Sequence, residues 1–272
     1  MSEKTVIYAD SLSDVFFQKK AIPSLKIVGG CTAGEELPDM FLSVLFNKDL
    51  KLLERRERYV EMGPAVTLAQ ILELGSEHLP SVFYDALSSV ANPQIRNIAT
   101  IGGNICAEGY KHTVYSPLLA LEARLEFQKP RTNGIGNESL YVPFLKFDRV
   151  PEDYVLTKIR IPVEEWDVAV FRRLGPSNEI NANSASFTFL ANSQKGMLAN
   201  LRIAFAGPFS FRSTELENRL IGTNLPLSEA ATKDLVDEAS IFYDEAAFEK
   251  KVKPILKQQF LNILRFSLAQ LT

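Results

Sequence analysis

The C-terminal part of the chain separates strand-like from helix-like segments, and this order constrains the fold more than any other feature. Two β-rich runs, Ala185–Leu190 and Leu201–Ala206, flank the polar stretch Asn192–Gly196, which predicts an antiparallel hairpin. From Ser228 onward the pattern is helical. The apolar face of the last helix is predicted to carry Leu256, Phe260, Leu264, Leu268 and Leu271. Strands followed by helices favour an α+β fold over a doubly wound parallel sheet.

The N-terminal part predicts shorter elements. Leu25–Val28 is typical of a strand that runs into a glycine turn. Asp39–Phe46 has mixed periodicity and is left open between a helix and an irregular stretch. Thr67–Gln70 has the spacing of a capping box, which predicts a helix after Thr67. Pro80 is expected to open another helix, which ends at Asn92-Pro93.

The middle of the chain predicts a helix and two strands. Pro117–Ala123 is typical of a buried helix, and Arg124–Gln128 and Tyr154–Ile161 alternate as strands do. Between them Lys129–Ser139, rich in Pro, Gly and Asn, predicts a loop.

Two glycine pairs, Gly29-Gly30 and Gly102-Gly103, each follow an apolar run. Glycine permits positive φ and lets a ligand touch the main chain. Consecutive N–H groups in such a turn can hold phosphate oxygens, and two loops could supply the donors of a diphosphate site. Either pair alone is more simply a turn. Neither pair fits a Walker loop or the Gly-x-Gly-x-x-Gly fingerprint, so a dinucleotide would bind outside the Rossmann scheme.

Composition excludes several classes of function. The 272 residues carry a formal net charge of −3, and their basic residues are scattered, so nucleic-acid binding is not expected. No apolar run approaches the ~20 residues that span a bilayer, and Met1–Ala21 lacks a signal-peptide pattern. A cytoplasmic protein without membrane contact is therefore expected. The cysteines Cys31 and Cys106 are too few for an iron–sulfur cluster or a Cys-rich zinc site, and neither a metal site nor a catalytic side chain is predicted.

The surroundings of the second glycine pair carry a family resemblance. The string ANPQIRNIATIGGNI, residues 91–105, resembles the signature of the FAD-binding subunit of molybdenum hydroxylases, the xanthine dehydrogenase and carbon monoxide dehydrogenase family. The pattern Ile-Arg-Asn-x-x-Thr-x-Gly-Gly-Asn is matched by Ile95, Arg96, Asn97, Thr100, Gly102, Gly103 and Asn104.

The resemblance extends over most of the chain in the same order. LKIVGGCTAG (residues 25–34) is similar to the family's first phosphate loop, and MGPAVTLAQI (62–71) to its helix entry, with Pro64 in place of alanine. SPLLALEARLEF (116–127) and NLRIAFAGPFSFRSTELENRLIG (200–222) resemble its later segments.

The resemblance implies an α+β architecture of two domains. Residues 1–162 would form the two-subdomain FAD-binding domain of the molybdopterin dehydrogenase type, with subdomains of about 1–61 and 62–162. Residues 163–272 would form the α+β C-terminal domain of the CO dehydrogenase flavoprotein type. FAD would lie between the subdomains, with its pyrophosphate on the two glycine loops. The cofactor-binding residues implied are Ile27, Val28, Gly29, Gly30, Cys31, Thr32, Thr100, Gly102, Gly103, Asn104 and Arg173.

The resemblance also implies a function: an oxidoreductase subunit that passes electrons from [2Fe–2S] clusters to FAD and then to NAD⁺. Its partners would be a molybdopterin-binding large subunit and a [2Fe–2S] small subunit. The chain departs from the family where an aspartate often follows the second loop, because Thr113 and Val114 stand there. Two alternatives therefore stay open: a scaffold subunit of the same complex without FAD, and a stand-alone flavin oxidoreductase.

Overall fold

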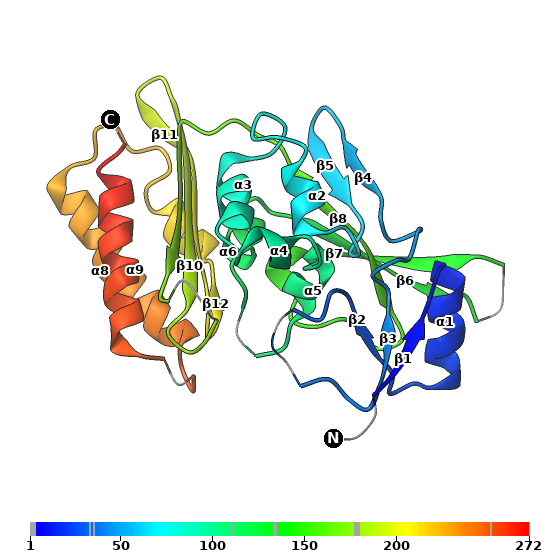
Figure 1. Ribbon diagram of the computed structural model, residues 1–272. Helices are drawn as coiled ribbons and strands as arrows, with labels where there is room; N and C mark the ends of the chain where they lie inside the picture. The colour runs from blue at the N-terminus through cyan, green and yellow to red at the C-terminus, as the bar shows by residue number, and fades with distance from the viewer. Residues whose placement is uncertain are drawn as a thin grey trace. The chain divides into compact units, whose positions relative to one another are not determined.

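The computed structural model describes residues 4–32, 34, 36–109, 111–132, 135–176, 180–250 and 252–271. The chain forms two compact units, each assembled from three stretches (Figure 1). The first unit comprises Met1–Leu79, Asn92–Ala107 and Glu122–Val163, and the second comprises Pro80–Ala91, Glu108–Leu121 and Glu164–Thr272. Each unit contains both sheet and helices, which confirms the predicted α+β class.

The unit boundaries do not simply follow the chain. Pro80–Ala91 and Glu108–Leu121, which the sequence assigns to the FAD-binding domain, pack with the C-terminal residues in the second unit. The predicted domain boundary at residue 162 stays a prediction.

The first unit begins with a small parallel sheet. Its strands are β1 (Thr5–Tyr8), β3 (Met40–Ser43) and β2 (Lys26–Val28), in that spatial order, and α1 (Leu12–Ala21) connects β1 to β2. The stretch Asp39–Phe46 contains β3, so neither predicted conformation is correct there. A central parallel strand is buried on both faces and shows no alternation, which explains why its pattern is ambiguous.

The first unit also contains a five-stranded antiparallel sheet in the order β4-β5-β8-β6-β7. The strands are β4 (Leu53–Arg55), β5 (Tyr59–Met62), β8 (Val155–Pro162), β6 (Arg124–Pro130) and β7 (Asn137–Pro143). The predicted loop Lys129–Ser139 is therefore too long. It contains the start of β7, an exposed edge strand that pairs with β6, and its residues Asn133 and Gly134 lie outside the described residues.

Short helices complete the first unit. They are α2 (Leu68–Leu72), α4 (Pro93–Arg96), α5 (Ile101–Cys106) and the 3₁₀ helix η1 (Phe144–Lys146). The predicted capping box is confirmed: the Thr67 hydroxyl accepts from the Gln70 N–H, and the Gln70 side chain accepts from the Thr67 N–H.

The second unit is built around a four-stranded antiparallel sheet in the order β12-β11-β10-β9. The strands are β9 (Val168–Leu174), β10 (Ala185–Gln194), β11 (Met197–Ala206) and β12 (Ser210–Phe211). The predicted hairpin is confirmed as β10–β11. Its tip, Lys195-Gly196, has positive φ at both residues, as a tight two-residue hairpin turn requires.

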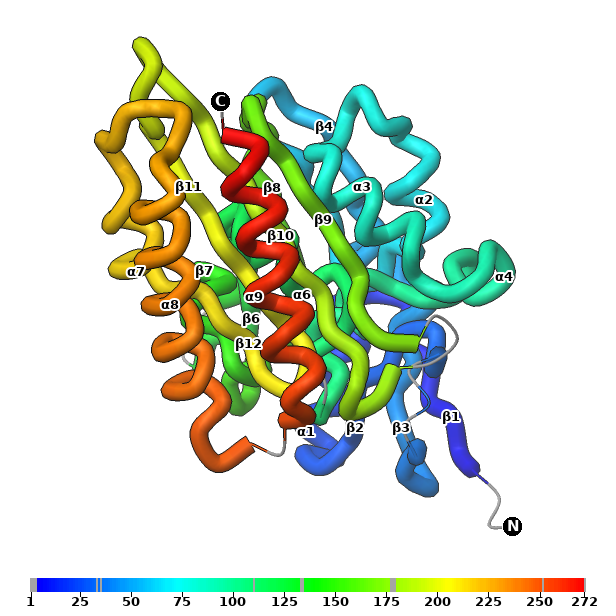
Figure 2. Tube along the Cα trace, turned by 90° about the vertical axis from the view of Figure 1, so that its left-hand side faces the viewer, coloured from blue at the N-terminus to red at the C-terminus, as the bar shows by residue number. Residues whose placement is uncertain are grey.

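Helices cover both faces of this sheet. On one face lie α7 (Thr214–Asn218), α8 (Glu229–Ala246) and α9 (Pro254–Leu268), and on the other α3 (Ser81–Ser88) and α6 (Tyr115–Ala120) (Figures 1 and 2). Pro80 precedes α3 as predicted, although this helix already ends at Ser88. The predicted apolar face of the last helix is confirmed for Leu256, Phe260, Leu264 and Leu268, which lie on α9 and are buried. Leu271 is buried as well, but it lies beyond the end of α9. All five pack against Phe187, Phe205 and Tyr243 in one core cluster.

Candidate functional site

The two predicted glycine loops come together in the first unit. The first loop, Gly29–Thr32, follows β2, and the second, Thr100–Asn104, contains the start of α5. A Cβ atom added to Gly29 would overlap the Thr100 hydroxyl, and one added to Gly30 would overlap the carbonyl oxygen of Ile98. The two loops therefore touch, at a distance that only glycine permits.

Positive φ is not what these glycines provide. Among the described residues near the loops, φ is positive at Cys31 (53°) and Gly34, and at none of the four paired glycines. The prediction that these glycines serve to adopt positive φ is therefore wrong. Close approach is the reason for glycine at these positions.

The second pair is not a free turn, because Gly102 and Gly103 lie in the first turn of α5. The Gly102 N–H donates to the Pro64 carbonyl (2.9 Å), and the Gly103 N–H donates to the Thr100 hydroxyl (3.1 Å). The neighbouring N–H groups of Ile101 and Asn104 are also bonded within the protein. The backbone donors of this pair are therefore already used within the protein, and its predicted role in phosphate binding stays a prediction.

The first loop differs from the second in the hydrogen bonding of its backbone N–H groups. Within the described part of the chain, no hydrogen bond is found for the backbone N–H groups of Gly29, Gly30, Cys31 and Thr32. Partial desolvation raises the pKa of the Cys31 thiol, so the loop carries no thiolate. Four successive neutral donors without an acceptor form an arrangement that can hold phosphate oxygens without a charged side chain.

One polar side chain of the second loop lies against the first loop, and another is buried without a hydrogen-bond partner for its oxygen among the described residues. Thr100 is buried, and its hydroxyl touches Gly29. The Asn104 side chain is only 8% exposed, and its Oδ1 has no hydrogen-bond partner among the described residues. A buried amide oxygen without a donor is unfavourable, by about 1–3 kcal/mol, unless a ligand or water donates to it. The site thus combines backbone donors with an unused acceptor.

The remaining predicted residues lie on strands. Ile27 and Val28 belong to β2, directly before the first loop. Arg173 lies on β9 in the second unit, opposite Ser186 of β10, and burial lowers its pKa. Arg173 thus belongs to the second unit, whereas both glycine loops belong to the first.

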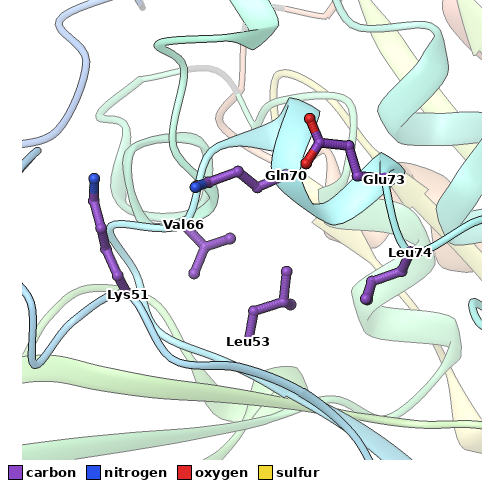
Figure 3. Close-up of a pocket in the computed structure, with 6 residues that line it drawn as sticks. All are labelled: Lys51, Leu53, Val66, Gln70, Glu73 and Leu74. Carbon is purple, nitrogen blue, oxygen red and sulfur yellow. The ribbon is translucent and has the colours of Figure 1, made fainter.

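The structure also contains a cavity that no sequence signal indicated as a site. It has a volume of about 250 Å³ and is lined by Lys51, Leu53, Val66, Gln70, Glu73 and Leu74 (Figure 3). The capping box fixes Gln70, whose amide nitrogen points toward the Lys51 side of the cavity (Figure 3). Pockets for drug-sized ligands have volumes of about 300–1,000 Å³, so this one cannot enclose a dinucleotide.

The fold and the loops define a class of protein: an α+β protein with two glycine loops in contact, neither of which is a Walker loop or a Rossmann fingerprint. Residues 2–164 match the family described as the FAD binding domain in molybdopterin dehydrogenase. The chain belongs to this family, and FAD is its cofactor. The predicted family and the predicted cofactor are confirmed.

The relatives agree with the family, and the solved structures agree with the fold. The xanthine dehydrogenase FAD-binding subunit of Escherichia coli O157:H7 is 27% identical over 202 residues, which cover 66% of this chain and 64% of that relative. The Cu,Mo-CO dehydrogenase in its cyanide-inactivated form has a chain with a TM-score of 0.78 at 15% identity, covering 99% of this chain and 96% of that one. A chain of the carbon monoxide dehydrogenase from Hydrogenophaga pseudoflava gives 0.76 at 15% identity, with the same coverage. The solved structures support the fold alone.

The residues present fit FAD. Its diphosphate needs donors, which the first loop offers, and its hydroxyl groups can donate to the unpartnered Oδ1 of Asn104. The Cβ positions of Gly29 and Gly30 are already filled by the second loop, so both loops are held in place before a ligand binds.

Proposed function

We propose that this chain is the flavin subunit of a molybdenum hydroxylase complex. It accepts electrons from [2Fe–2S] clusters of a small subunit, which receive them from a molybdopterin-binding large subunit, and passes them to NAD⁺. The observation that carries the proposal is the contact between two glycine loops in a chain of the FAD-binding family. Four backbone donors of the first loop have no acceptor among the described residues.

The cofactor-binding residues are proposed to act as follows. Bound FAD supplies the redox chemistry through its flavin ring. The N–H groups of Gly29–Thr32 donate to phosphate oxygens, while the Thr100 hydroxyl caps α5 and keeps the loops in contact. Asn104 accepts a hydrogen from a hydroxyl group of the cofactor. Ile27, Val28, Gly102 and Gly103 shape the surface around these groups. Arg173, on β9 of the second unit, stays a predicted cofactor-binding residue.

The need for partner subunits follows from what the chain contains. Its two cysteines cannot ligate a four-thiolate [2Fe–2S] cluster. Among the described residues, no three His, Cys, Asp or Glu side chains are grouped to hold a metal ion. The clusters that supply the electrons therefore lie outside these 272 residues. No described helix is long and apolar enough to cross a bilayer. We place the complex in the cytoplasm.

A substitution in the second loop tests the cofactor site. Gly103 is exposed, and a Cβ added there meets only the Thr100 hydroxyl, at 3.0 Å. Gly103→Val should leave the protein folded and remove most of its flavin, because the branched side chain would occupy space beside the first loop. Flavin released on denaturation is measured by fluorescence, and folding by thermal unfolding. Ala107→Val, just after α5, is the control for the added bulk.

The same measurements separate the alternatives. A folded Gly103→Val protein that retains its flavin would contradict the proposed site. Wild-type protein that is colourless when purified with its partner subunits would favour the scaffold subunit without FAD. Flavin-containing protein that never associates with molybdenum or iron–sulfur subunits would favour a stand-alone flavin oxidoreductase.

A further inference from the structure

Along the strands of the five-stranded sheet in the first unit, polar side chains on one face alternate with buried side chains on the other. Cross-strand register places six side chains on it, which we call the outer face: Glu61, Arg124, Glu126, Tyr141, Lys158 and Arg160. Their neighbours along the strands, such as Val60, Leu125 and Ile159, point into the core.

On the outer face the acids are buried and the bases are exposed. The side chains of Glu61 and Glu126 are 10% and 11% exposed, whereas those of Lys158 and Arg160 are 38% and 49% exposed. Arg124 is exposed as well. Positive charge therefore dominates the surface, although the face also contains carboxylates.

The strand register places two arginines directly opposite one another. Arg124 of β6 pairs with Arg160 of β8, and like charges in such positions destabilise a sheet. Glu61 neutralises Arg160 but is shared with Lys158, which lies 3.2 Å away. Arg124 makes no ion pair with any residue that the structure describes. One arginine of this pair thus lacks a counter-charge.

Arg160 is held in a fixed orientation. Its Nε and Nη2 both donate to Oε2 of Glu61, at 3.1 and 2.7 Å, and its guanidinium lies 4.4 Å from the centre of the Tyr59 ring. A fixed arginine loses little side-chain entropy when a partner binds. The hydrogen bond to Glu61 also raises the pKa of Arg160, so its charge persists.

We infer that the outer face docks an acidic protein surface, in which a carboxylate lies between Arg124 and Arg160. The inference rests on the proposed function, because the partner we name is another subunit of the complex. Arginine and tyrosine are the residues that dominate binding energy at protein interfaces, and Tyr141 beside Glu126 is 67% exposed. A nucleic acid fits less well, because its phosphate backbone is bound by a larger number of basic side chains, whereas this face has three.

Charge reversal in the full chain, co-expressed with the molybdopterin and iron–sulfur subunits, tests this inference. Arg124→Glu should weaken assembly at least tenfold at low salt, measured by titration of the subunits, and the difference should shrink in high salt. Arg149→Glu makes the same charge change on an exposed loop of the first unit and should have no effect. Arg124→Gln provides a milder variant if the reversal impairs folding. Flavin content should be unchanged in all three.

Each result has a defined meaning. Equal loss in the Arg124 and Arg149 variants would overturn the inference, because it would reflect net charge alone. Wild-type affinity in both Arg124 variants would exclude this face. If Arg124→Glu instead abolishes binding to anionic vesicles or DNA and leaves assembly unchanged, a protein partner is the wrong choice. If wild-type protein contains flavin but never assembles, the subunit role itself fails, and the inference fails with it.

Discussion

The first unit contains two Gly-Gly pairs whose backbone N–H groups differ in their hydrogen bonding. Gly29-Gly30 leads into a loop whose four backbone N–H groups have no acceptor among the described residues. Gly102-Gly103 lies in α5, and both of its N–H groups are bonded within the protein. The difference shows that a glycine pair after an apolar run does not by itself provide a ligand site. The first pair leads into the proposed binding loop, and the second pair supports that loop.

The support comes from two neighbours of the second pair. Pro64 accepts from Gly102, and Thr100 accepts from Gly103 while its side chain contacts Gly29. Thr100 also forms an isolated bridge with Thr67, the cap of α2. The helix entry at Thr67 and both glycine loops are therefore parts of one connected structure.

The largest effect is expected at the binding loop. Gly30→Ala should destabilise the first unit by about 3 kcal/mol and abolish flavin binding, because its Cβ would overlap a backbone carbonyl that cannot rotate away. Gly34→Ala in the same segment is the matched control. It has positive φ but open space around it, so a loss of about 1 kcal/mol is expected. Denaturant unfolding measures both, and equal losses would mean that contact between the loops is unimportant.

A smaller effect is expected at the second glycine pair, which supports the first loop. Gly102→Ala would bring a Cβ within 2.5 Å of the Pro64 side chain and should destabilise by about 2 kcal/mol. Gly103→Ala, one residue later, should cause no net loss, because alanine favours the helix by up to about 1 kcal/mol. Thermal unfolding of the two variants compares the side of α5 that packs against Pro64 with the exposed side at Gly103. A reversed order would contradict this assignment of sides.

The smallest effect is expected at the hydroxyl that joins the two loops. Thr100→Val keeps the shape of the side chain and removes the cap of α5, which should destabilise by about 1 kcal/mol. Thr100→Ser retains the hydroxyl and should preserve the cap. Flavin content would fall in the valine variant alone if the hydroxyl also serves the cofactor. A stability unchanged by the valine would show that the cap contributes nothing.

Local signals in the sequence predicted much of the fold. The capping box at Thr67, the hairpin of β10 and β11 and the apolar face of α9 were confirmed. The predicted turn Asn192–Gly196 is shorter in the structure, because β10 continues to Gln194. In each confirmed case the interacting residues lie within one turn of a helix or across one tight turn, so the pattern contains the whole interaction. The family motif at residues 95–104 identified the cofactor in the same way, from a single contiguous segment.

Elements that depend on distant partners were missed. Strand β7 is exposed along its length, so no alternation marked it, and it forms because its backbone pairs with β6. Strand β3 lies between β1 and β2 and has no pattern of its own. The opposition of Arg124 and Arg160 depends on the pairing of β6 with β8 and could not be read from either strand alone.

The sequence by itself determined the α+β class, the family and the cofactor, because apolar periodicity and a contiguous motif carry that information. Only the tertiary structure decided which glycine pair keeps free donors. A backbone N–H is available to a ligand only when no acceptor of the protein lies nearby. The acceptors for the second pair, Pro64 and Thr100, are brought into place by the fold.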